Sequence, residues 1–255
     1  MAKVGIIGAG AWGTAIAKVL AENGHRVQIW ARGTEVAEEI NANHRNERYL
    51  PDVSLPADLT AGTEITSVVA DARYLIFATP SLHILPVMRR ILAVRRITEG
   101  DAIIGVITKG FIQTESGTQL IVETLENYLP GFYMGNLVYI SGPSHAEEVA
   151  RGKLTGLISA SVNPRNAIRF RELLNVHPLM VFSSLDIVGV QVAAAMKNVI
   201  AIAFGIMDAL KETTAAGFGD NTGSLLLAAG LNEIQHLAIA LGATHPETFT
   251  SIAGV

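Results

Sequence analysis

The stretch Lys3-Val-Gly-Ile-Ile-Gly-Ala-Gly-Ala-Trp-Gly13 decides the fold of this 255-residue chain. Its apolar start predicts a buried strand, and its glycines have the G-x-G-x-x-G spacing of a turn between a strand and a helix. In such a turn Gly8 permits the tight bend, Gly10 leaves room for a pyrophosphate, and Gly13 lets the helix approach the strand. Because the helical pattern Thr14–Asn23 follows directly, the context favours dinucleotide binding over a glycine turn that serves only packing.

Strand-like and helical patterns alternate through most of the chain. Short runs rich in Val and Ile predict strands at Lys3–Ile7, Arg26–Ala31, Arg73–Ala78, Ala102–Thr108, Leu137–Ile140, Thr155–Ala160 and Leu179–Ser183. Apolar residues at helical spacing predict helices at Thr14–Asn23, Val36–Asn43, Leu82–Leu92, Gly117–Tyr128, Ser144–Arg151 and Pro164–Leu174. This alternation predicts an α/β fold with a Rossmann-like, doubly wound, mainly parallel sheet that carries helices on both faces.

The pattern changes after Ser184, where strand signals end and long apolar helices begin. The expected helices are Asp186–Lys211 and Asn221–Leu241, joined by the segment Glu212–Asp220. The sequence therefore predicts a dinucleotide-binding domain over residues 1–185 and an all-α domain over residues 186–255.

The composition limits the classes of function. Hydrophobic residues make up 49% of the chain, charged residues 16%, and the formal net charge is −4, so no basic surface for nucleic acid is expected. The absence of cysteine excludes disulfides and thiolate sites, and the histidines lack ligand spacing, so no metal site is predicted. With no export signal at the N-terminus, we expect a cytoplasmic protein with a small-molecule ligand.

The most apolar region, Val188–Leu210, is long enough to span a membrane. It carries Lys197, Asn198 and Asp208, which are costly inside a bilayer. The pattern therefore favours a buried helix of a soluble protein.

The end of the predicted second strand bears on the choice of cofactor. It reads Ile29-Trp-Ala-Arg-Gly33 and has no acidic residue. NAD-binding folds usually place an Asp or Glu there, which accepts hydrogen bonds from the ribose hydroxyls. Arg32 can instead pair with a 2′-phosphate, so NADP(H) is slightly favoured over NAD(H), a solvated surface arginine being the alternative. Binding of both cofactors is compatible with the sequence.

Two further strands end in polar residues at the carboxyl edge of the sheet, where ligands of open α/β folds bind. Ala102–Ile107 is followed by Lys109, which can face a nicotinamide or an anionic substrate, or extend into solvent. Ile140 is followed by Ser141-Gly-Pro-Ser-His-Ala-Glu147, in which a Ser and a Glu three residues apart have capping-box spacing. The predicted helix start there can bind phosphate or cofactor, or serve only as a cap.

Lys197 is the most informative residue of the second half. It lies in Val192-Ala-Ala-Ala-Met-Lys-Asn-Val-Ile-Ala-Ile-Ala203, a helix that is apolar on nearly every side. Burial lowers the pKa of a lysine ammonium group, and a lysine so tuned can exchange a proton with a carbonyl or hydroxyl oxygen while hydride moves. We expect Asn198 to orient this lysine or the substrate. The alternative is a lysine that reaches out to water.

Five motifs occur in order along the chain: Gly8-Ala-Gly-Ala-Trp-Gly-Thr-Ala15, Asn46-Glu-Arg-Tyr-Leu-Pro51, Thr108-Lys-Gly110, Ser141-Gly-Pro-Ser144 and Met196-Lys-Asn198. Together they resemble the NAD(P)-dependent glycerol-3-phosphate dehydrogenases, the bacterial branch in particular. Each motif alone occurs in many dehydrogenases, whereas their combination is specific.

The resemblance implies reversible reduction of dihydroxyacetone phosphate to sn-glycerol 3-phosphate by hydride transfer to C2, feeding glycerophospholipid synthesis. Besides the glycine turn, it implies cofactor contacts at Ala11, Trp12, Arg32, Tyr49, Lys109 and Ala146. It implies substrate contacts at Lys109, Gly142, Ser144 and Lys197, and a general acid/base role for Lys197. We take Lys109 and Asn198 as its catalytic neighbours. A homodimer is an expectation at the level of the family.

The sequence departs from the family towards its end. Gly223 and Ala229 replace an expected lysine and arginine, and the sequence stops at Val255, where the family continues into an Arg-Asn pair that binds phosphate and cofactor. We therefore expect a helical domain that lacks its last part and exposes apolar surface. The alternatives are a catalytically impaired dinucleotide-binding module and another two-domain dehydrogenase of the β-hydroxyacid type.

Overall fold

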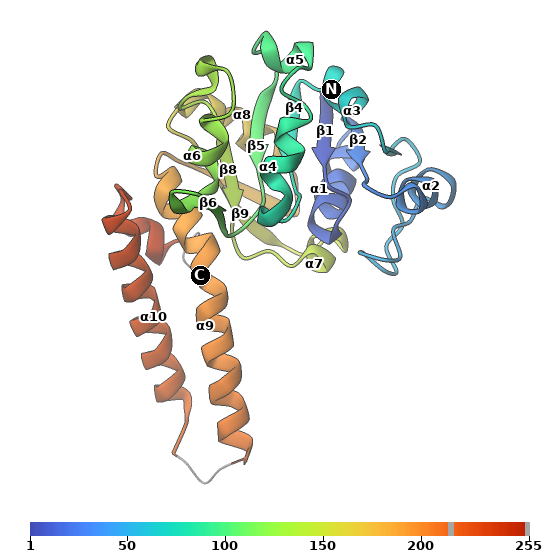
Figure 1. The fold of residues 1–255 in the computed structure, drawn as a ribbon. Helices are drawn as coiled ribbons and strands as arrows, with labels where there is room; N and C mark the ends of the chain where they lie inside the picture. The colour runs from blue at the N-terminus through green and yellow to red at the C-terminus, as the bar shows by residue number, and fades with distance from the viewer. Residues whose placement is uncertain (214–216, 253–255) are drawn as a thin grey trace.

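The computed structural model describes residues 1–213 and 217–252, which form a twisted sheet flanked by helices and a projecting pair of long helices (Figure 1). The strands are β1 (Lys3–Ile7), β2 (Arg26–Trp30), β3 (Thr60–Gly62), β4 (Tyr74–Phe77), β5 (Ile103–Val106), β6 (Phe111–Thr114), β7 (Gly117–Leu120), β8 (Val138–Ser141), β9 (Thr155–Ala160) and β10 (Leu179–Ser184). The helices are α1 (Ala11–Glu22), α2 (Thr34–Asn43), α3 (Ile65–Ala70), α4 (Ser81–Arg89), α5 (Arg95–Thr98), α6 (Ile121–Glu126), α7 (Ala146–Ala150), α8 (Pro164–Leu174), α9 (Ile187–Thr213) and α10 (Asp220–Ala240), with short 3-10 turns at Gly131–Tyr133 and Pro246–Thr250.

The main sheet has eight strands in the order β10-β9-β8-β5-β4-β1-β2-β3. The chain order reverses between β1 and β4, which places the switch point of a doubly wound fold beside the glycine turn. All neighbours pair in parallel except β8 and β9, so β9 and β10 run against the other six strands. The predicted mainly parallel sheet is therefore confirmed.

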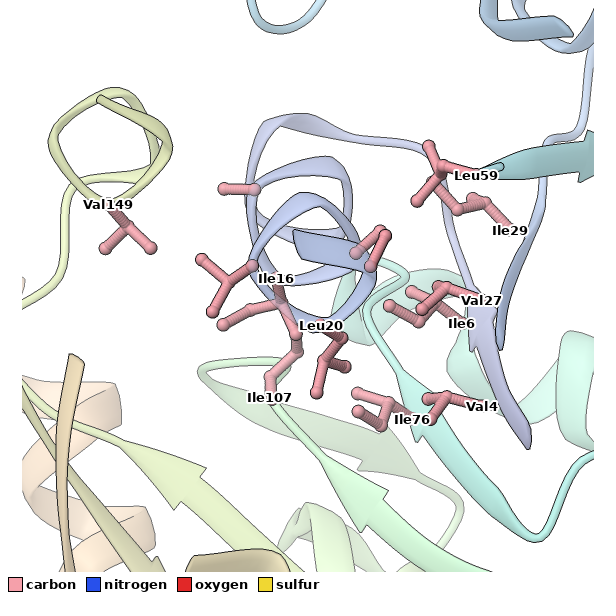
Figure 2. Close-up of a cluster of buried hydrophobic side chains, with 14 of the residues drawn as sticks. Val4, Ile6, Ile16, Leu20, Val27, Ile29, Leu59, Ile76, Ile107 and Val149 are labelled. Carbon is pink, nitrogen blue, oxygen red and sulfur yellow. The ribbon is translucent and has the colours of Figure 1, made fainter. Parts of the chain in front are cut away.

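Helices cover both faces of the sheet with separate apolar cores. One core joins β1 and β2 to α1, α2, α7 and α8, and Figure 2 shows its centre, where Ile16 and Leu20 of α1 lie over Ile6 and Ile76. Ile16 and Leu20 are fully buried, and each contributes roughly 1.5–3 kcal/mol to stability. The other core joins the opposite face to α3, α4, α5, α6 and the start of α9.

The predicted helix Gly117–Tyr128 is wrong in its first part. Phe111–Thr114 and Gly117–Leu120 instead form the antiparallel hairpin β6-β7, and the helix α6 begins only at Ile121. Gly117 is the first residue of β7 and has φ of +107°. Glycine adopts this backbone conformation without strain. The turn lacks the Asn-Gly or Asp-Gly signal by which such a hairpin is recognised in sequence.

The long helices α9 and α10 form an antiparallel pair that projects from the sheet (Figure 1). The prediction of a buried helix holds only for the first part of α9, whose buried residues end at Ala194. Further along, Val199, Ile202 and Ile206 are 57%, 63% and 58% exposed. Beyond Ala194, α9 packs along α10. Among the described residues α9 alone is long and apolar enough to span a membrane, by length and composition only, and 39% of its most apolar window is buried in the protein.

Two parts of the predicted helical region lie partly outside the described residues. The segment Glu212–Asp220 includes residues 214–216, and the last predicted stretch, Ser251–Val255, includes residues 253–255.

Candidate functional site

A cavity of about 670 Å³ lies at the carboxyl edge of the sheet, where β1, β2, β4 and β5 end. It gathers residues that are far apart in sequence but that the sequence analysis selected. Those lining it are Gly8, Gly10, Ala11, Trp12, Arg32, Tyr49, Lys109, Ser144 and Ala146. Gly13, Gly142, Lys197 and Asn198 do not line it.

The glycine turn forms one wall of this cavity and needs its glycines for different reasons. Gly8 has φ of +126°, and a Cβ there would lie 2.9 Å from the backbone carbon of Ala78. A Cβ on Gly13 would collide with the carbonyl oxygen of Gly8, so α1 approaches β1 only without it. A Cβ on Gly10 would meet no protein atom within 4 Å, and the space beside this residue belongs to the cavity.

Several polar groups around the turn fit a bound dinucleotide. No side chain caps the first turn of α1, so its backbone N–H groups remain available to phosphate oxygens. Trp12 and Thr79 line the cavity, and each has a buried polar side-chain atom without a hydrogen-bond partner in the described part of the chain. Buried polar groups are rarely left unpaired in proteins, so these atoms mark a place for a polar ligand.

Asn46, the first residue of the motif Asn46–Pro51, supports the glycine turn. It is 1% exposed, and its Nδ2 donates to the carbonyl oxygen of Ala9 at 2.9 Å and to Oγ1 of Thr14 at 2.8 Å. The loop before Tyr49 thus fixes the glycine turn from behind. Its burial is set by tertiary packing, which no local spacing reveals.

The far end of the cavity carries mixed charge. Arg32 follows β2 and is exposed, as expected for a group that meets a phosphate. The guanidinium of Arg48 lies 5.3 Å from the ring centroid of Tyr49, and both residues line the cavity. Glu35, in the first turn of α2, also lines it and was missed, because it follows the strand end by several residues. The cavity therefore offers both a cation and a carboxylate at this end.

The predicted substrate residues meet at the carbonyl oxygen of Gly142. Lys197 Nζ donates to this oxygen at 3.3 Å, across 55 residues of sequence, and Ser144 Oγ donates to it at 3.2 Å. Gly142 has φ of +151°, and a Cβ there would lie 2.5 Å from the carbonyl oxygen of Gly156, so only glycine fits. Lys109, which lines the cavity, lies close enough to Lys197 for each to change the other's pKa.

Burial makes both lysines weaker bases than usual. It lowers the pKa of Lys109, and the neighbouring charge of Lys197 lowers it further, to about 8. Burial likewise lowers the pKa of Lys197, as its place on an apolar helix predicted. Two adjacent ammonium groups favour an anionic ligand, and a lysine with a lowered pKa gives up its proton more readily.

Tyr139, on β8, supports the turn that carries Lys109. It is fully buried, and its hydroxyl donates to the carbonyl oxygen of Thr108 at 2.9 Å. Thr108 Oγ1 in turn donates to the carbonyl oxygen of Thr79 at 2.7 Å. These bonds continue beyond the ladder between β5 and β8, whose last pair is Val106 with Tyr139.

Two expectations about the local geometry are not met. The predicted capping box is wrong, because α7 begins at Ala146, its N-cap is His145, and no side chain bonds to the cap. Ser144 instead bonds back to Gly142, since it lies one residue before the cap. Asn198 is exposed and makes no side-chain hydrogen bond in the described part of the chain, so its orienting role stays a prediction.

Comparisons with known proteins agree with this geometry. The family model for the N-terminus of NAD-dependent glycerol-3-phosphate dehydrogenase matches residues 3–167, and the model for its C-terminus matches residues 186–255. A glycerol-3-phosphate dehydrogenase [NAD(P)+] of Treponema denticola is 54% identical over 99% of this chain and 72% of the relative. One of Bacillus subtilis is 38% identical over 100% of this chain and 70% of the relative.

The solved structures add a match in three dimensions. The crystal structure of a glycerol-3-phosphate dehydrogenase from Coxiella burnetii superimposes with a TM-score of 0.86 at 30% identity, covering 99% of this chain and 73% of the other. Both family models, the relatives and this structure agree along the chain. The chain therefore belongs to the NAD-dependent glycerol-3-phosphate dehydrogenase family.

Proposed function

We propose that this protein catalyses the reversible reduction of dihydroxyacetone phosphate to sn-glycerol 3-phosphate with NAD or NADP as cofactor. The observation that carries the proposal is the pairing of Lys109, which lines the dinucleotide cavity, with Lys197, which donates to the carbonyl oxygen of Gly142. The relatives are named for this activity, and they do not favour a β-hydroxyacid dehydrogenase. A silent binding module is likewise not favoured.

Each lysine has a distinct part in the proposed chemistry. When bound, the reduced nicotinamide supplies the hydride that adds to C2 of the substrate. Lys197 gives a proton to the oxygen on C2 as the carbonyl becomes a hydroxyl, and it takes the proton back in the reverse direction. Lys109 keeps a positive charge below its pKa of about 8, so it attracts the substrate phosphate and the developing negative charge on oxygen. The carbonyl oxygen of Gly142, which also accepts from Ser144, holds the ammonium group of Lys197 in place.

The preferred cofactor follows from the charges at the far end of the cavity. We propose a slight preference for NADPH, because Arg32 lines the cavity just after β2, is exposed, and can pair with a 2′-phosphate there. Glu35 favours NADH instead, since its carboxylate repels the 2′-phosphate of NADPH and can accept hydrogen bonds from ribose hydroxyls. Use of both cofactors is consistent with this balance.

The remaining expectations concern organisation and location. We propose that residues 1–185 bind the cofactor and that the helices after them supply Lys197 to the substrate. Lys197 lies in the middle of α9, and its contact with Gly142 ties this helix to the site. We therefore expect α9 to serve the site of a cytoplasmic enzyme rather than to span a membrane. The homodimer remains a prediction.

The proposal is tested by following NADPH oxidation with three substrates: dihydroxyacetone phosphate, unphosphorylated dihydroxyacetone, and an unphosphorylated β-keto acid. We expect turnover with the phosphorylated ketone alone, because the ammonium group of Lys109 attracts its phosphate. Turnover only with the keto acid would support the β-hydroxyacid alternative. Tight NADPH binding without turnover of any substrate would support the silent module.

A further inference from the structure

Asp186 is a buried charge that the proposed chemistry does not use. It lies between β10 and α9 and is 2% exposed. An ionised carboxylate is costly to bury unless hydrogen bonds or an opposite charge compensate for the lost water. No lysine or arginine of residues 1–213 and 217–252 forms an ion pair with it. Its compensation must therefore come from hydrogen bonds.

Three donors from two chain segments converge on this carboxylate. Oδ1 accepts from the backbone N–H of Gly189 at 3.0 Å and from that of Thr244 at 3.1 Å. Oδ2 accepts from Oγ1 of Thr248 at 2.7 Å, and Thr248 is itself buried. A Cβ on Gly189 would collide with Oδ2, so the glycine makes room for the carboxylate. The positive end of the α9 dipole adds further compensation.

The same carboxylate thus joins two distant parts of the chain, because Thr244 and Thr248 lie 58 and 62 residues beyond Asp186. One is the start of α9, which carries Lys197 about three helical turns further on. The other is the segment Thr244–Ile252, which returns to the sheet after α10.

That returning segment reaches the back of the substrate turn. A Cβ on Gly156 of β9 would lie 3.0 Å from Cδ1 of Ile252, so the isoleucine packs directly on this strand. The carbonyl oxygen of Gly156 in turn lies 2.5 Å from where a Cβ of Gly142 would be. Lys197 and Gly142, the partners of the 3.3 Å hydrogen bond, are therefore both supported by elements that Asp186 holds.

We infer that Asp186 is a positioning residue for the substrate side of the site. Its three hydrogen bonds fasten α9 and the segment Thr244–Ile252 to each other, and so set Lys197 against Gly142. The cofactor cavity, which Lys109 lines, contains none of these contacts. Loss of the fastening is therefore expected to weaken substrate use and to spare cofactor binding. The inference rests on the proposed function, because it assigns Lys197 and Gly142 to the substrate.

The test compares Asp186→Ala and Thr248→Val with the unchanged protein. Asp186→Ala also leaves two N–H groups unpaired and can prevent folding, so Thr248→Val, which removes only the hydroxyl, is the decisive variant. We expect Thr248→Val to raise KM for dihydroxyacetone phosphate about five- to tenfold, less than the full worth of a hydrogen bond to a charged group, because Thr248 does not touch the substrate itself. The Kd for NADPH, measured by fluorescence titration, should stay within about twofold. Thr248→Ser should restore the normal KM.

Thr250→Val is the matched control, because Thr250 lies on the same 3-10 turn and is exposed, and within residues 1–213 and 217–252 its hydroxyl bonds to the carbonyl oxygen of Glu247 alone. A purely structural role for Thr248 would lower Tm in the valine variant but leave the KM of the folded enzyme unchanged. That result would overturn the inference, and so would an equal loss of NADPH affinity.

Hydrogen exchange separates this inference from the proposed function. We expect Thr248→Val to speed exchange of amides in Thr244–Ile252 and in the first turns of α9, but not in α1. Faster exchange there with no turnover of dihydroxyacetone phosphate by the unchanged protein would contradict the proposed function and leave the fastening intact. Unchanged exchange in both segments would contradict the fastening itself.

Discussion

At the glycine turn, the wall of the cofactor cavity is made of backbone. On the substrate side, by contrast, the side chains of Lys197 and Ser144 come from separate segments and donate to the same carbonyl oxygen, that of Gly142. The turn from Gly8 to Gly13 is contiguous in sequence and needs only close packing against Ala78 and β1. Lys109 follows β5 and Lys197 lies on α9, so their meeting depends on how α9 is anchored. Cofactor binding and turnover should therefore be separable by mutation.

The largest separation is expected from Lys197→Ala. Loss of the proton donor should lower kcat about 10²- to 10⁴-fold, because general acid catalysis contributes on that scale. The Kd for NADPH should not change, since Lys197 does not line the cavity. Steady-state kinetics and a fluorescence titration measure the two effects.

Lys211→Ala is the control for Lys197→Ala. Lys211 lies on the same helix, is half exposed, and faces Asp220 at 3.8 Å. It should keep normal kcat. Full activity in Lys197→Ala, or a parallel loss of NADPH binding, would contradict the assignment of Lys197 as the proton donor.

A smaller effect is expected from the charge of Lys109. Its pKa of about 8 means that the side chain is charged below this pH and neutral above it. Because the charge attracts the substrate phosphate, kcat/KM for dihydroxyacetone phosphate should fall as pH rises through about 8. Lys109→Met should abolish this fall of kcat/KM with pH. It should also lower kcat/KM about 10- to 100-fold at neutral pH, the worth of a hydrogen bond to a charged group. A pH profile identical to that of the unchanged enzyme would contradict this account.

The smallest effect is expected at the exposed end of the cavity. Arg32→Ser should raise KM for NADPH about fivefold and leave KM for NADH unchanged, because an exposed charge pair contributes at most about 1 kcal/mol. Arg26→Ser, at the other end of the same strand, is the matched control. A loss of affinity for NADH of the same size would mean that Arg32 does not contact the 2′-phosphate.

Much of the cofactor side could be predicted from sequence because it is local. The strand, the glycine turn and the start of α1 follow one another, so spacing alone places their groups. The lowered pKa of Lys197 was also predictable, since the sequence on either side of it is apolar and burial lowers the pKa of a lysine. These features need no knowledge of distant contacts.

The remaining features depend on tertiary packing. Glu35, Arg48 and Thr79 reach the cavity from three segments without a shared motif. Two of the three donors to Asp186, from Thr244 and Thr248, lie more than fifty residues away, and the local pattern reveals neither of them. The apolar pattern of α9 likewise predicted a helix but not which part of it is covered.

The most direct test of the separation between the two sides is the NADPH titration of Gly10→Ala. Gly10 has φ of −72°, and a Cβ there meets no protein atom, so alanine should fold without a loss in Tm. The methyl group takes space next to the backbone where a pyrophosphate would lie, so we predict at least about a tenfold rise in Kd. Gly205→Ala, which also enters open space but lies on α9, should leave Kd unchanged. An unchanged Kd in Gly10→Ala would contradict the assignment of this turn to the cofactor.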